Sequence, residues 1–141
     1  MVRIRPGRPG DLDALRRIQA RALVEPWPEL LEPATRGTVG LFVAENEKPV
    51  GYAVVLAGSE DVAYVPELAV HPDHQNEGYG SQLLSVLLDH LDREAYSEVR
   101  LTVQAGDERA RRFYDRHGFE EVQRLADHFE SGDGLLLSRE L

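Results

Sequence analysis

The residues that could do chemistry are concentrated in one turn, between His71 and Gly80. Gln75, Gly78 and Gly80 are spaced as Q-x-x-G-x-G directly before a leucine-rich run. The first backbone N–H groups of a helix lack internal partners, and the macrodipole adds partial positive charge there. Glycines, which have no Cβ, let an anion approach these amides closely. The turn therefore predicts a phosphate site, although such a hexamer is also typical of an ordinary helix start that contains glycine.

The segments on either side of the turn must position it. The apolar run Val62 to Val70 precedes it and reads as a buried strand. Apolar residues then recur at three- and four-residue steps, which predicts a helix starting near Gly78 with one apolar stripe. The stripe contains Tyr79, Leu83, Leu84, Leu87, Leu88 and Leu91. A strand thus leads through a tight turn into a helix, without the residues of a dinucleotide motif or a P-loop.

A second strand-to-helix unit follows. Val99 to Val103 has the pattern of another buried strand, and Gly106-Asp107 then opens a short helix that ends at Gly118-Phe119. The two units together resemble the GNAT superfamily of acetyl-CoA-dependent N-acetyltransferases. The matching motifs are L-A-V-H-P-x-x-Q-x-x-G-x-G from Leu68 to Gly80 and A-x-x-F-Y-x-x-x-G-F from Ala110 to Phe119.

The resemblance covers nearly the whole chain and implies a single domain, residues 1–141, of the α/β (α+β) class. The implied GNAT fold is a mixed sheet of about seven strands with four helices. Its two motif strands run parallel and splay apart, and acetyl-CoA enters the wedge between them. The remaining elements expected in chain order are a strand over 2–5, a helix from an Asp11 N-cap to about Val24, a short helix over 29–36, strands over 39–45 and 50–56, and closing strands over 120–125 and 135–141.

Composition narrows the functional class. Of 141 residues, 42% are hydrophobic, no stretch approaches the ~20 apolar residues of a membrane span, and the start has no hydrophobic signal core, so we expect a cytoplasmic protein without membrane contact. The absence of cysteine excludes disulfides and thiolate metal sites. His71 and His74 lack further ligands at metal-binding spacing, so no metal site is expected.

The chain is acidic and almost free of lysine. It has 25 acidic and 16 basic residues, of which 15 are arginine, and its net charge is −9. Such a surface repels nucleic-acid phosphates, so nucleic-acid binding is not expected. The composition resembles that of proteins from salt-accumulating, halophilic cells, and GC-rich codon usage would explain it equally well.

The resemblance assigns the cosubstrate site residue by residue. The backbone amides from 75 to 81 would bind the CoA pyrophosphate. Main-chain groups of Leu68 and Val70 would pair with the pantetheine arm, and the Val70 N–H would polarise the thioester carbonyl. Gln75 stands where many relatives carry arginine, so one charge contact is lost there. The residues of the phosphate turn are Gln75, Asn76, Glu77, Gly78, Tyr79, Gly80 and Ser81.

Two catalytic candidates follow from the resemblance. Tyr114 matches the family tyrosine that protonates the leaving thiolate, the alternative being an aromatic packing role. Glu67 is the candidate general base, acting directly or through water, or else a carboxylate that only pairs locally. Ribosomal-protein N-terminal acetyltransferases carry their acid on the next motif strand, where this chain has Thr102. Asp107, where relatives often have asparagine, is expected to cap its helix more readily than to bind CoA.

The acceptor is not fixed by these motifs. Specificity in the family depends on the first two helices and the last hairpin, here residues 24–37 and 127–134. Glu25 and Trp27 suit an incoming ammonium group by charge and cation–π attraction. His128 and Phe129 replace the tyrosine pair of protein N-terminal acetyltransferases, which leaves both a protein N-terminus and a small amine open. A non-catalytic acyl-CoA sensor is the alternative from another class, and a homodimer is common among relatives.

Overall fold

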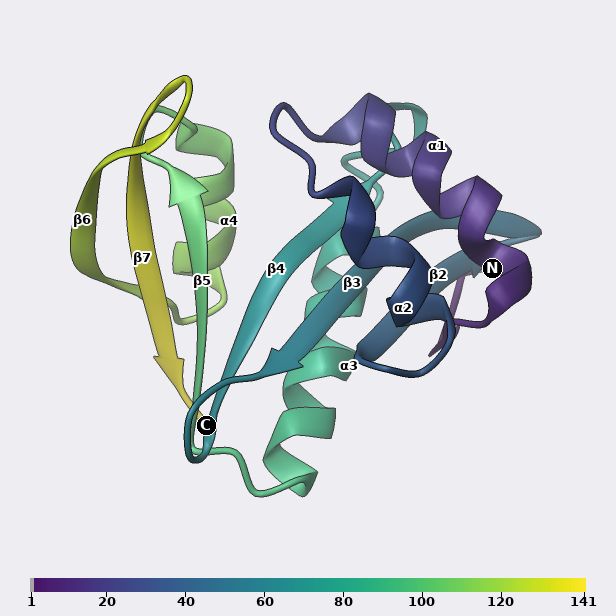
Figure 1. The fold of residues 1–141 in the computed structure, drawn as a ribbon, viewed down its shortest axis with the longest axis horizontal. Helices are drawn as coiled ribbons and strands as arrows, with labels where there is room; N and C mark the ends of the chain where they lie inside the picture. The colour runs from purple at the N-terminus through teal and green to yellow at the C-terminus, as the bar shows by residue number, and fades with distance from the viewer. Residues whose placement is uncertain (1) are drawn as a thin grey trace.

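The sheet that organises the molecule has seven strands in the order β1-β2-β3-β4-β5-β7-β6. In the computed structural model, which describes residues 2–141, α1 and α2 cover one face of its first four strands and α3 covers the other (Figure 1). Every neighbouring pair is antiparallel except β4 and β5. The expected fold class, a mixed sheet of about seven strands with four helices and one splayed parallel pair, is confirmed.

The elements follow the predicted order. The helices are α1 (Leu12–Ala22), α2 (Leu31–Thr35), α3 (Tyr79–Arg93) and α4 (Glu108–Arg116). Short 3-10 turns precede α1, α2 and α3. The strands are β1 (Arg3–Pro6), β2 (Gly40–Asn46), β3 (Lys48–Ala57), β4 (Val62–Val70), β5 (Glu98–Gln104), β6 (Glu120–Phe129) and β7 (Gly132–Glu140).

The alternation of side chains along the central strands divides the core in two. On β3, Tyr52 and Val54 pack with α1 and α2, whereas Ala53 and Val55 pack on the opposite face with the leucines of α3. Successive strand residues point to opposite faces, and both faces of this sheet are covered by helices. This explains why β3 reads as a continuous apolar run.

The two closing strands, predicted over 120–125 and 135–141, have different bounds in the structure. The connection between the closing strands is much shorter than the expected 127–134 segment, because β6 continues to Phe129 and β7 begins at Gly132. An irregular register between Leu125 and Phe129 accommodates Asp127, whose φ is +51°. The hairpin therefore projects as an extended ribbon beside α4 (Figure 1).

Asp11 occupies the N-cap position of α1, as predicted, but the expected side-chain cap is not formed. Instead its two oxygens accept hydrogen bonds from the Arg5 guanidinium at 2.9 and 2.8 Å, and Glu45 accepts a further one from Arg5 at 2.9 Å. Arg5 and Asp11 are both buried, and the guanidinium lowers the pKa of Asp11 below its ordinary value. This buried ion pair ties β1 to the start of α1.

Within residues 2–141, no helix combines the length and apolarity needed to cross a membrane.

Candidate active site

The site is a cavity of about 760 Å³ where the parallel strands separate. β4 and β5 pair only from Val62↔Glu98 to Tyr64↔Arg100, and beyond that point they diverge (Figure 1). Residues 65–70 of β4 and 101–104 of β5 form the walls of the opening, and the starts of α3 and α4 border one end. The backbone edges of both strands are therefore open to a ligand in this region.

The phosphate turn lies at the end bordered by α3. Gly78 is the residue before the helix and has a φ of +84°, a conformation that strains any residue with a side chain. The first hydrogen bond of α3 runs from the Gln82 N–H to the Gly78 carbonyl at 3.1 Å. The N–H groups of the three residues before Gln82, Tyr79 to Ser81, therefore have no partner within the helix and border the cavity.

The main chain of β4 presents alternate peptide groups to the cavity. The His71 N–H donates to the Val50 carbonyl of β3 at 2.8 Å, so this group points away from β5. Because neighbouring residues of a strand direct their peptide groups to opposite sides, the N–H and C=O groups of Val70 and Leu68 point toward the cavity. Gln75 confirms this direction, since its Nε2 donates to the Val70 carbonyl at 3.0 Å from the cavity side.

Tyr114 borders the cavity from α4. Its side chain is only 8% exposed, and its ring contacts Phe113 and Phe119 edge-on. The hydroxyl has no hydrogen-bond partner in the described part of the chain and is not sealed off from solvent. Burial, and secondarily the negative charge of Asp107, raises the pKa of Tyr114 above that of free tyrosine. A phenol in this state remains protonated at neutral pH and is able to donate a proton into the cavity.

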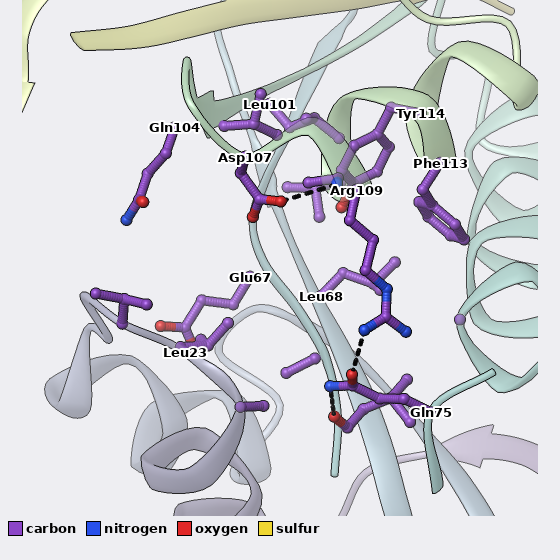
Figure 2. Close-up of a pocket in the computed structure, with 18 of the residues that line it drawn as sticks. Leu23, Glu67, Leu68, Gln75, Leu101, Gln104, Asp107, Arg109, Phe113 and Tyr114 are labelled. Carbon is purple, nitrogen blue, oxygen red and sulfur yellow. Dashed lines mark hydrogen bonds between the residues drawn. The ribbon is translucent and has the colours of Figure 1, made fainter. Parts of the chain in front are cut away.

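Asp107 caps the helix that carries Tyr114. Its Oδ1 accepts a hydrogen bond from the Ala110 N–H at 3.0 Å (Figure 2). The carboxylate also borders the cavity. The expected capping interaction is thus present.

Glu67 lies in the cavity wall, but its carboxylate is engaged on both oxygens. Oε1 accepts from Gln19 Nε2 at 2.9 Å and from the Tyr52 hydroxyl at 2.8 Å, and Oε2 accepts from the Trp27 N–H at 2.8 Å. The side chain is 6% exposed. Burial, followed by the charge of Glu67, raises the pKa of Tyr52, so this phenol remains a donor. The network joins β4 to β3, to α1 and to the loop that follows α1.

Sequence reasoning missed the partners of Glu67. Gln19 lies on the buried side of α1 with 4% of its surface exposed, and its Nε2 also donates to the Trp27 carbonyl at 3.0 Å. A polar residue on the apolar stripe of a helix was the available signal, because such a residue must find buried partners. Tyr52 lies in an apolar strand, and nothing in the sequence around it indicated that its hydroxyl would bind Glu67.

A hydrogen bond links the loop after α1 to the β6–β7 hairpin beside the far end of the cavity. Glu25, in the loop after α1, accepts a hydrogen bond from the Glu130 N–H at the tip of the β6–β7 hairpin, at 2.8 Å. Leu23, Glu25 and Phe129 border the cavity at this end. Two segments 105 positions apart thus meet over the end of the cavity opposite the phosphate turn.

Ser81 and His117 connect the two helices that border the cavity. Ser81 Oγ and His117 Nε2 lie 3.0 Å apart. Burial, and then the charges of Arg116 and Arg139, lower the pKa of His117. The Ser81 hydroxyl therefore already has one neutral partner.

The sequence was compared with protein families and with known proteins. The model of the Acetyltransferase (GNAT) family matches residues 12–119. The [Ribosomal protein bS18]-alanine N-acetyltransferase of Escherichia coli (strain K12) is 29% identical over 126 residues, which are 88% of this chain and 84% of that protein. An uncharacterized N-acetyltransferase of Methanocaldococcus jannaschii is 30% identical over 133 residues, 90% of this chain and 83% of its own.

Solved structures agree with the sequence comparison. The crystal structure of the ribosomal-protein-S18-alanine N-acetyltransferase from Escherichia coli superposes with a TM-score of 0.86 and 26% identity, covering 99% of this chain and 94% of that one. A GNAT family acetyltransferase from Elizabethkingia anophelis with acetyl-CoA bound has a TM-score of 0.86 at 19% identity, covering 99% of this chain and 98% of that one. At such low identity the second likeness shows the shared fold alone.

Proposed function

This chain belongs to the GNAT family of acetyltransferases and is an N-acetyltransferase, and on that premise we propose that it acetylates the α-amino group of a protein N-terminus. We further propose that acetyl-CoA enters at the phosphate turn and that the acceptor enters at the opposite end, in the cytoplasm. The observation that carries the proposal is the single cavity that borders both the first turn of α3 and the Glu25–Glu130 contact.

The named relatives favour a protein acceptor over a small amine. The Escherichia coli relative is named for acetylation of the alanine terminus of a ribosomal protein, and it aligns with most of this chain. The acceptor end of the cavity has the features that such a substrate requires. Leu23 and Glu25, in the loop after α1, border the cavity, and Phe129 borders it from the facing hairpin. Trp27, farther along the same loop, is 49% exposed. An extended peptide could lie between these two segments.

The residues present fit the cosubstrate. Bound acetyl-CoA supplies an activated acetyl thioester. The free N–H groups at the start of α3 would bind its pyrophosphate, and the inward-facing main chain of Leu68 and Val70 would align the pantetheine arm. The Val70 N–H would donate to the thioester oxygen as negative charge develops there, a contribution of about 3 kcal/mol for one well-placed donor.

The proton transfers complete the reaction. A C–N bond forms between the acceptor amine and the acetyl carbon, and the C–S bond breaks. Tyr114 would donate its hydroxyl proton to the departing sulfur. The amine loses its proton to water, which returns a proton to the Tyr114 oxygen, so the products are the acetylated amine and the CoA thiol.

For Glu67 we propose a positioning role in place of direct proton abstraction. Three donor groups already occupy its two oxygens. They belong to α1, to β3 and to the loop that follows α1. Neither oxygen of Glu67 is therefore left without a hydrogen-bond partner. Its removal would displace Trp27 and the loop around it.

The proposal is tested by CoA thiol release with matched acceptors. One peptide carries a free N-terminal alanine and no lysine, and its partner is the same peptide with the N-terminus formylated and one lysine added. Spermidine and free amino acids complete the panel, each measured in low and in molar KCl. We expect turnover on the free N-terminus alone, with the acetyl group located there by mass spectrometry. Turnover confined to spermidine, to amino acids or to the lysine side chain would overturn the proposal.

A further inference from the structure

Arg109 connects α4 to the turn that precedes α3, at the phosphate end of the cavity. From the first turn of α4, its Nη1 donates to Gln75 Oε1 at 2.8 Å and its Nη2 donates to Asn76 Oδ1 at 2.9 Å. Figure 2 shows the guanidinium extended from α4 to Gln75 along one side of the cavity. The cation therefore lies beside the turn whose amides face the cavity.

Gln75 has at most one side-chain N–H left for a ligand, and its amide carries no charge. Its oxygen accepts from Arg109, and its Nε2 donates to the Val70 carbonyl at 3.0 Å. Arg109 differs, because a guanidinium has five N–H groups and only two of them are used here. Its remaining N–H groups carry positive charge and can bind a phosphate without first giving up a protein contact.

Two further arginines continue the same face of the helix. Arg109, Arg112 and Arg116 are spaced i, i+3 and i+7 and all border the cavity. Within residues 2–141, none of the three lies within ion-pair distance of a carboxylate. In a chain with a net charge of −9, this stripe concentrates positive charge at the phosphate end.

We infer that Arg109 binds the pyrophosphate of CoA, supplying the cationic contact that the neutral amide of Gln75 cannot supply. The inference rests on the proposed binding of acetyl-CoA in this cavity. The two hydrogen bonds to the turn hold the fork in place, so little side-chain entropy is lost when the phosphate binds. Arg112 and Arg116 add electrostatic attraction for the CoA phosphates along the same face of α4.

The test measures affinity by calorimetry and needs no acceptor. Arg109→Gln and Arg109→Lys are compared with wild type for binding of CoA, dephospho-CoA and pantetheine. Arg111→Gln is the matched control, because it makes the same change in net charge on α4 but its side chain lies outside this cavity and contacts the Ala105 carbonyl. Loss of a charge-assisted contact predicts a roughly 10- to 100-fold rise in Kd for Arg109→Gln.

Each ligand reports on a different contact. The inference predicts equal losses for CoA and dephospho-CoA, no change for pantetheine, a smaller loss for Arg109→Lys, and a control within about twofold of wild type. The loss should shrink in molar KCl, since salt screens a partly exposed charge.

Three results would overturn it. A loss confined to CoA would place Arg109 on the 3′-phosphate. An equal loss for pantetheine would mean that Arg109 only braces the turn. Unchanged CoA affinity in Arg109→Gln would remove the contact altogether. If wild type itself fails to bind CoA, the proposed function fails, and that outcome is distinct from the other three.

Discussion

Replacing Tyr114 by phenylalanine should slow acetyl transfer while leaving the fold intact. The ring is 8% exposed and contacts Phe113 and Phe119, and both contacts survive in Tyr114→Phe. The lost hydroxyl has no hydrogen-bond partner in the described residues. We therefore expect the melting temperature to change by no more than about 2 °C, because no buried partner is left unsatisfied.

The expected rate effect follows from the same geometry. A positioned general acid contributes about 10²- to 10⁴-fold, and this cavity is open enough for water to substitute in part. We expect kcat to fall by about 100-fold, equivalent to about 2.7 kcal/mol of barrier. Because burial and Asp107 raise the pKa of Tyr114, deprotonation of its hydroxyl should cause no loss of wild-type kcat up to about pH 9.

The assay is CoA thiol release at saturating acetyl-CoA and acceptor, with acetyl-CoA affinity measured separately. Tyr96→Phe is the matched control, because Tyr96 packs against the core but does not border the cavity. A Tyr114→Phe enzyme with kcat within threefold of wild type would refute the role as general acid. A fall in kcat that is matched by an equal fall for Tyr96→Phe, or by loss of acetyl-CoA binding, would refute it as well.

Two further predictions concern the buried carboxylates. In Glu67→Gln, the new amide places an N–H group among donors. We therefore expect the acceptor KM to rise about 10-fold and the melting temperature to fall, while the pH profile of kcat/KM keeps its shape. If Glu67 were the general base, the substitution would instead remove the acidic limb of that profile and lower kcat by about 100-fold or more. In Asp11→Asn, a buried cation loses its main partner while Glu45 still pairs with Arg5, so we expect a loss of about 3 kcal/mol in the free energy of unfolding, measured by urea denaturation. Because Arg5 lowers the pKa of Asp11 from 3.8, the stability from this pair is present above about pH 4 and is lost as the pH falls through the folded-state pKa. Wild type should thus lose stability in acid more steeply than Asp11→Asn, and parallel acid profiles would contradict this reasoning.

The sequence alone determined the order of the elements and the backbone geometry of the turn before α3. These features depend on local rules: the apolar period of α3, the glycine at a positive φ before it, and the buried runs of β4 and β5. Tyr114 could be assigned to a helix next to the second motif strand for the same reason. The proposed role of Tyr114 came from the family resemblance. Residues that are neighbours in a motif keep their relative positions wherever the local backbone conformation is the same.

Only the tertiary structure decided which groups face one another across the cavity. Glu67 meets Gln19 from 48 positions away, and Arg109 meets Gln75 from 34 positions away. No local pattern encodes such distances, since they depend on where β4 and β5 stop pairing and on the faces that α1 and α4 turn inward. A one-residue change in strand register would point the side chain of Glu67 to the other face of the sheet, where its three donors are out of reach.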